Sequence, residues 1–118
     1  IVDNWLASHN ERSWLLRSSN DDIQFFWSIV GTGSIGLIAS TNAFTVGTEV
    51  EIEIRKEAGT ISMFIDGSAT AADSDSISGS FFQNGQGITI GDYNKRYDQD
   101  GGGRQLGGSI RYLTIENL

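Results

Sequence analysis

Apolar and polar residues alternate along most of this chain, which is the pattern of β-strands that bury one face. The clearest stretch is residues 48–55, where Ile52 and Ile54 would face one side and three glutamates the other. The alternation returns over residues 61–65, after a short turn that contains a glycine. We therefore predict a β-hairpin over residues 48–66, with the isoleucines inside and the glutamates outside.

The rest of the chain also predicts short strands joined by turns, and no window shows helical periodicity. Further strands are expected near residues 3–8, 12–18, 23–28, 34–39, 87–91 and 107–116. The chain has 15 glycines and no proline, so its turns depend on Gly, Asn, Asp and Ser. Two polar stretches, residues 67–80 and 92–104, are predicted to be loops. The predicted fold class is all-β, an antiparallel sandwich or barrel.

Composition limits the functions that are open to the chain. Its 118 residues suit a single domain over residues 1–118. The net charge of −7 argues against nucleic acid as a partner, because phosphates attract clustered Lys and Arg. No apolar run approaches the roughly 18 residues of a membrane span, so membrane insertion is not expected. Cysteine is absent, which excludes disulfides, Cys-ligated zinc and thiol catalysis.

Three stretches follow one another in an order that resembles a known family. A tryptophan, a polar turn and Arg-Ser-Trp span residues 5–14, and an aromatic strand ending in Trp-Ser follows at 23–28. Phe-Ile-Asp-Gly closes the hairpin at 64–67, and Gly-Ile-Thr-Ile-Gly at 87–91 precedes Gly-Gly-Ser-Ile-Arg-Tyr-Leu-Thr-Ile-Glu-Asn at 107–117. Together they resemble the concanavalin A-like lectin/glucanase superfamily, in its laminin G-like and pentraxin-like branch, and in particular modules of phage structural proteins.

The resemblance implies an antiparallel jelly-roll β-sandwich. It does not fix a function, because this fold carries lectins, hydrolases, adhesion modules and virion parts. Family members are usually longer, with a strand pair before Val2 and often a closing strand after Leu118. We therefore expect either a shortened domain or one whose missing strands belong to further residues. Because the sequence starts at Ile1 and not at Met, we also expect a mature product or a piece of a longer polypeptide. We also expect another chain, or the rest of that polypeptide, to cover the edge beside residues 107–116.

Glu49, Glu51 and Glu53 are the first candidates for catalysis. Glucanases of the superfamily use a Glu-x-Asp-x-Glu strand, and retaining hydrolysis needs two carboxyl groups about 5–5.5 Å apart. Here Glu51 occupies the middle position in place of Asp, and a solvated outer strand face would give the same pattern. His9 lies in a polar turn without a recognisable catalytic partner. We expect no enzymatic activity, with a glycoside hydrolase as the less favoured alternative.

Calcium is the cofactor that the sequence suggests, because this ion takes about six to eight oxygen ligands. Asp98 and Asp100 offer alternating carboxylates in a glycine-rich loop, and residues 20–22 and Asp66 offer further acidic groups. Asp and Asn also stabilise turns by local hydrogen bonding. These residues are therefore either calcium ligands or purely structural turn residues.

The loop at residues 92–104 also carries the chemistry of a sugar site, because a tyrosine ring can stack on a sugar while polar side chains bond its hydroxyl groups. The predicted ligand-binding residues are Tyr93, Asn94, Tyr97 and Arg104. The alternative is that both tyrosines cover the end of the sheet. Trp14 and Trp27 are expected in the core, and Trp5 either in the core or at a sugar.

These observations lead to a prediction of function. We predict a non-catalytic glycan-binding or adhesion module of an extracellular or virion surface protein. The resemblance favours a phage tail fibre, spike or capsid appendage, with a cell-surface glycan or neighbouring virion chains as partners. The chain would then belong to a homo-oligomer or a larger polypeptide. The alternative is a purely structural decoration or interface domain without a small ligand.

Overall fold

The computed structural model describes residues 2–6, 10–19, 21–43, 45, 47–83, 85, 87–90 and 109–114. These residues form eight β-strands in two sheets, and all the strand pairings are antiparallel. The described residues include no helix, and thus none long and apolar enough for a membrane span. The predicted all-β class is confirmed.

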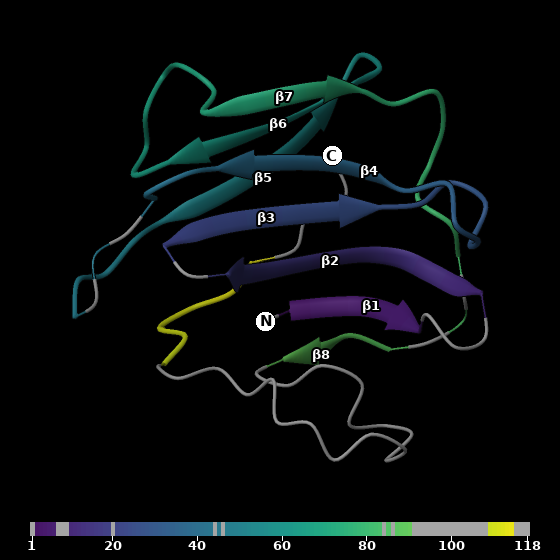
Figure 1. Cartoon of the computed structure of the whole chain (residues 1–118), viewed down its shortest axis with the longest axis horizontal. Coiled ribbons are helices and arrows are strands. Elements are labelled where there is room, and N and C mark those ends of the chain that lie inside the picture. Colours follow the sequence, from purple (N-terminus) through teal and green to yellow (C-terminus); the bar gives the residue numbers. More distant parts are fainter. Residues whose placement is uncertain are drawn as a thin grey trace.

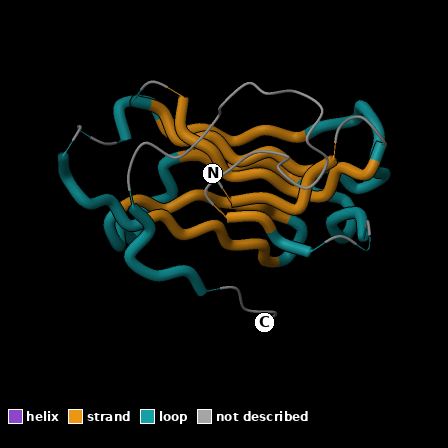
Figure 2. The backbone as a smooth tube through the Cα atoms, turned by 90° about the horizontal axis from the view of Figure 1, so that it is seen from below, coloured by secondary structure: helices purple, strands orange, loops and turns teal. Residues whose placement is uncertain are grey.

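The larger sheet has five strands in the order β4-β3-β2-β1-β8, and the smaller sheet has three in the order β5-β6-β7. The larger consists of β1 (Val2–Leu6), β2 (Glu11–Ser19), β3 (Asp22–Trp27), β4 (Gly36–Ser40) and β8 (Thr89–Ile90). The smaller consists of β5 (Ile52–Glu57), β6 (Thr60–Ile65) and β7 (Asp73–Ser76). Figure 1 shows β5 passing behind β4 and β3, and Figure 2 shows the strands in two layers. This arrangement is compatible with a β-sandwich.

The two sheets share one hydrophobic core. Its buried members are Ile23, Phe25 and Trp27 of β3, Ile38 of β4, Ile61 and Met63 of β6, and Ile77 after β7. Buried and half-buried residues alternate along β3, as the sequence predicts for a strand that turns one face to the core. Phe25 stacks with Trp14 and Trp27, at ring-centroid distances of 6.3 and 6.2 Å. The prediction that these two tryptophans belong to the core is confirmed, with Trp27 buried and Trp14 partly buried against it.

β5 and β6 form the predicted hairpin. Ala58 and Gly59 make its two-residue turn with φ angles of 47° and 79°, and positive φ at both positions is typical of a type I′ turn. The register pairs Ile52 with Ile65 on the inner face, where both are partly buried against the core. The glutamates at 49, 51 and 53 are exposed. The predicted orientation is therefore confirmed, although the strand begins at Ile52 and not at residue 48.

Asp73 of β7 joins the two sheets by a hydrogen bond. Its Oδ2 accepts the backbone N–H of Ala39 in β4 at 2.8 Å, and its Oδ1 accepts the N–H of Ser74 at 2.8 Å. Because β4 is an edge strand of the larger sheet, its outward N–H groups have no strand partner there. The Asp73 carboxylate satisfies one of them from the other sheet.

Two of the predicted elements, one loop and one strand, are wrong. The sequence predicts a loop over residues 67–80, yet β7 lies within it. The β7 sequence Asp-Ser-Asp-Ser lacks apolar alternation because it contributes backbone pairing to β6, while the contact with the core comes from Ile77 after it. The sequence also predicts a strand over residues 107–116, but the described part, residues 109–114, lies in no strand and is exposed. The other predicted strands agree with the structure apart from their ends.

Candidate functional site

The larger sheet carries apolar side chains on its outer face as well as toward the core. Because successive strand residues point to opposite faces, Phe25 faces the core and Phe26 faces outward. The register places Leu15 of β2 and Leu37 of β4 on either side of Phe26, and we call these three residues the outer row. Leu15 is only 4% exposed, whereas Leu37 is 45% exposed. A solvated sheet face is normally polar, so the outer row favours a binding role for this face.

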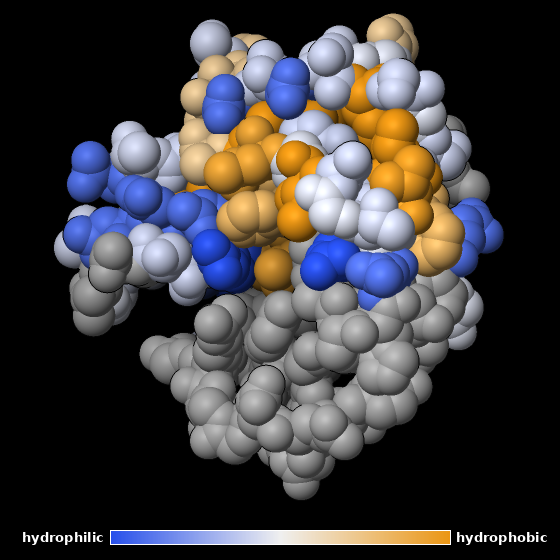
Figure 3. All heavy atoms as spheres, turned by 45° about the vertical axis from the view of Figure 1, so that its right-hand side comes forward, coloured by the Kyte–Doolittle hydropathy of each residue, from blue (hydrophilic) through white to orange (hydrophobic). Residues whose placement is uncertain are grey.

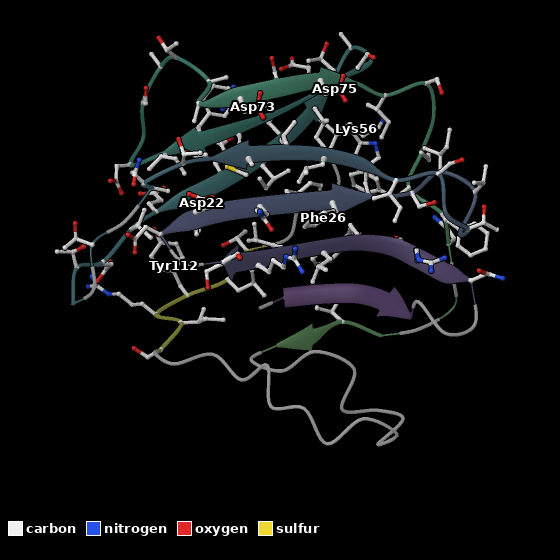
Figure 4. All side chains as sticks on the ribbon, in the orientation of Figure 1. Asp22, Phe26, Lys56, Asp73, Asp75 and Tyr112 are labelled. Carbon is white, nitrogen blue, oxygen red and sulfur yellow. The ribbon has the colours of Figure 1, made fainter. Side chains whose placement is uncertain are left out.

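Arg17 of β2 lies over the outer row. Its guanidinium carbon is 4.7 Å from the centroid of the Phe26 ring, which is a cation–π distance. Its Nε–H donates a hydrogen bond of 2.9 Å to Oε1 of Gln24, its register partner in β3. Figure 4 shows Phe26 and Asp22 along this strand. The guanidinium is thus held on one edge by an amide and on one face by a ring.

The smaller sheet repeats this arrangement with a different partner. Arg55 lies 4.7 Å from the Phe64 ring centroid, and its Nε and Nη2 donate to Oε1 of Glu53 at 3.0 and 2.7 Å. Glu53 is a carboxylate and compensates the charge of Arg55, whereas the amide of Gln24 is neutral. Arg17 forms no ion pair within the described part of the chain. Within the described residues the half-buried Arg17 thus has no acidic partner, in a protein whose net charge is −7.

The loop from β3 to β4 presents a second apolar surface. The Ser28 hydroxyl, in a side chain that is 1% exposed, accepts the N–H of Gly31 at 3.0 Å and so fixes the turn. Gly31 has a φ of 76°, and a Cβ there would lie 2.6 Å from the Asn10 carbonyl oxygen and 2.7 Å from the Phe82 ring. The loop exposes Ile29, Val30 and Ile35 by 39%, 49% and 44%. Figure 3 brings this end of the molecule forward and shows apolar side chains gathered there.

The site residues predicted from sequence lie outside the described residues. These are Tyr93, Asn94, Tyr97 and Arg104 for the sugar and Asp98 and Asp100 for calcium, together with His9, Asn20 and the side chain of Trp5. Their roles remain predictions.

Two of the other predicted calcium candidates, Asp22 and Asp66, bind backbone groups. Asp22 Oδ1 accepts the N–H of Asn42 at 3.3 Å, and Asp66 Oδ1 accepts the N–H of Glu51 at 2.9 Å. Across the described ranges, no group of three or more His, Cys, Asp or Glu is placed to hold a metal ion. Asp22 and Asp66 thus fit the structural alternative, in which an aspartate stabilises a turn or a strand end.

The glutamates of the hairpin face solvent. Glu53 pairs with Arg55, and Glu49 Oε1 lies 3.1 Å from Nη1 of Arg111. Exposed pairs of this kind contribute about 0–1 kcal/mol to stability. Glycoside hydrolysis requires two carboxyl groups that face each other across a sugar ring. The described hairpin offers solvated glutamates, two of which have arginine partners.

Sequence reasoning missed Arg17, Gln24 and Phe26 as site residues. A clue was present, because Phe25 and Phe26 are adjacent and only one of two adjacent rings in a strand can face the core. Arg17 and Gln24 lie opposite each other because of the register between β2 and β3. Composition and alternation do not fix that register.

Comparison with protein-family models, with curated proteins and with solved structures finds no match for this chain. The case for a function therefore depends on the chain's own side chains and on the resemblance of its sequence motifs. Of the two described arginine–phenylalanine pairs, the one at Arg17 and Phe26 has a neutral amide partner in place of a carboxylate.

Proposed function

We propose that this chain is a non-catalytic glycan-binding or adhesion module of an extracellular or virion surface protein, built on a concanavalin A-like jelly-roll sandwich. The observation that carries the proposal is Arg17, held over Phe26 beside the exposed Leu37. Apolar and aromatic side chains can cover the C–H faces of sugar rings, and a guanidinium can donate several hydrogen bonds to sugar oxygens. The resemblance to phage modules favours a tail fibre, spike or capsid appendage.

The exposed glutamates support a non-catalytic role. Glu53 and Glu49 are exposed and paired with Arg55 and Arg111, so they do not face each other across an enclosed sugar site. Incubation with β-glucans is therefore expected to release no reducing sugar. A release that Glu49→Gln abolishes would instead favour a glycoside hydrolase.

A purely structural interface domain is the second candidate. The apolar loop favours it, since Ile29, Val30 and Ile35 are exposed on a turn that Ser28 holds in place. Apolar groups presented in this way are typical of surfaces that meet another protein. In this case the partner would be a neighbouring virion chain or a second copy.

A glycan array probed with the folded chain separates the two candidates. Binding that Leu37→Ala weakens would support glycan recognition by the outer face. Binding that instead fails in Tyr97→Ala, or in Asp98→Ala and with a calcium chelator, would assign it to the loop at residues 92–104. A chain that binds no glycan, and whose self-association is lost in Val30→Ser, would favour the interface domain.

A further inference from the structure

We propose that the ligand of the outer face is an acidic saccharide, with Arg17 binding its carboxylate or sulfate group. This inference rests on the proposed glycan-binding function and adds the class of sugar. It depends on the geometry of one guanidinium, on the charge of its partner and on the apolar surface beside it.

Within the described residues, the contacts of the Arg17 guanidinium involve its Nε–H and one of its faces. Gln24 takes the Nε–H at 2.9 Å, and Phe26 covers one face at 4.7 Å. In the described chain the two Nη groups make no hydrogen bond. Two neighbouring Nη donors match two oxygens of a carboxylate or a sulfate in a paired hydrogen bond. Because the side chain is already held in place, binding costs little conformational entropy.

The neutral hydrogen-bond partner of Arg17, Gln24, is the reason to expect an anionic ligand. Arg55 has the same distance to an aromatic ring, but Glu53 compensates its charge. Arg17 has a neutral amide in the corresponding role. Asp22, which shares the outer face of β3 with Gln24, accepts the N–H of Asn42 and forms no ion pair with Arg17. Among the described residues no carboxylate therefore compensates the positive charge of Arg17.

The surroundings favour a sugar over a small free anion. Leu37 is 45% exposed and lies next to Phe26 in the register, so the anion site continues into an apolar surface. A sugar ring carries apolar C–H faces and, when it is a uronic acid or a sulfated sugar, an anionic group.

The test compares charged and neutral forms of the same polymer. Binding of the folded 118-residue chain is measured by biolayer interferometry on polygalacturonate and on its methyl-esterified form, and on dextran sulfate and dextran. We expect binding to an acidic polymer and not to its neutral counterpart, and weaker binding as NaCl is raised. The two pairs distinguish a carboxylate from a sulfate ligand.

Four variants assign the binding to Arg17. Arg17→Gln removes the charge, and Gln24→Glu gives Arg17 the acidic partner that Arg55 already has. Both should lower the affinity for the acidic polymer about tenfold or more, since hydrogen bonds to a charged group are strong. Arg17→Lys should give an intermediate loss, because it keeps the charge without the paired donors. Arg55→Gln is the matched control and should bind as the parent does.

Circular dichroism and thermal melting confirm that each variant is folded. If Gln24→Glu and Arg17→Gln bind the acidic polymer as the parent does, the Arg17 site is refuted. If the parent binds neutral and acidic polymers equally, the acidic ligand is refuted while glycan binding survives. If no saccharide binds here or on the glycan array, the proposed function fails together with this inference.

Discussion

Asp73 connects β7 to β4, so its removal should weaken the contact between the two sheets. Asp75 is a matched control on the same strand, and Figure 4 labels both side chains. Each accepts the N–H of the next residue through Oδ1, from Ser74 at 2.8 Å and from Ser76 at 2.7 Å. Asp73 also accepts the N–H of Ala39 in the other sheet. Asp73→Ala and Asp75→Ala therefore differ by one hydrogen bond between sheets.

The expected magnitudes follow from what each substitution removes. Asp75→Ala removes a local hydrogen bond at an exposed position and should cost at most about 1 kcal/mol. Asp73→Ala additionally removes a charged acceptor and leaves the Ala39 N–H without a partner, so it should cost about 1.5–3 kcal/mol more. Asp73→Asn retains one acceptor oxygen and should lie between the two.

Urea unfolding followed by tryptophan fluorescence measures these differences, provided that the m-value is unchanged. The buried Trp27 should report the opening of the core. Equal unfolding free energies for Asp73→Ala and Asp75→Ala would refute the argument that the bond to Ala39 holds the sheets together.

Three further substitutions test the core and the turns by the same unfolding measurement. Ile61→Ala should cost about 2–5 kcal/mol because Ile61 is fully buried, whereas Ile52→Ala should cost less at its partly exposed position, and the reverse order would contradict the core assignment. Gly31→Ala should cost at least about 1 kcal/mol, since its positive φ and the Phe82 ring both oppose a Cβ; no loss would contradict the loop geometry. Ala58→Asn should stabilise the hairpin by about 1 kcal/mol, because Asn tolerates a φ of 47° better than Ala, and a lower unfolding midpoint would count against the type I′ turn.

The β5–β6 hairpin was predictable because two independent features of the sequence agree. The alternation of Ile52 and Ile54 with glutamates predicts a strand with one buried face, and Gly59 marks the turn. β7 was not predictable in this way, since a strand that contributes mainly backbone hydrogen bonds needs no apolar pattern. Residues 109–114 show the opposite case, where an alternating sequence lies in no strand, because alternation supplies no pairing partner.

The candidate site was less predictable than the fold because it depends on register. Arg17 and Gln24 are seven residues apart in sequence and meet because β2 and β3 pair with one particular offset. A shift by one residue would move every side chain of a strand to the other face. Alternation identifies which residues share a face, but it leaves open which residues of two strands become neighbours.

The pairing of β8 with β1 bears on the kinetics of folding. In the described sheets the other pairings join strands consecutive along the chain, while β8 returns to β1 from the far end. About nine times as many residues separate Val2 from Ile90 as separate Met63 from Asp73, so closing that loop costs about 2 kcal/mol more in chain entropy. Two locally formed meanders should therefore fold first and β8 should add last. Its amides should accordingly exchange with solvent at a lower opening free energy than those of β3.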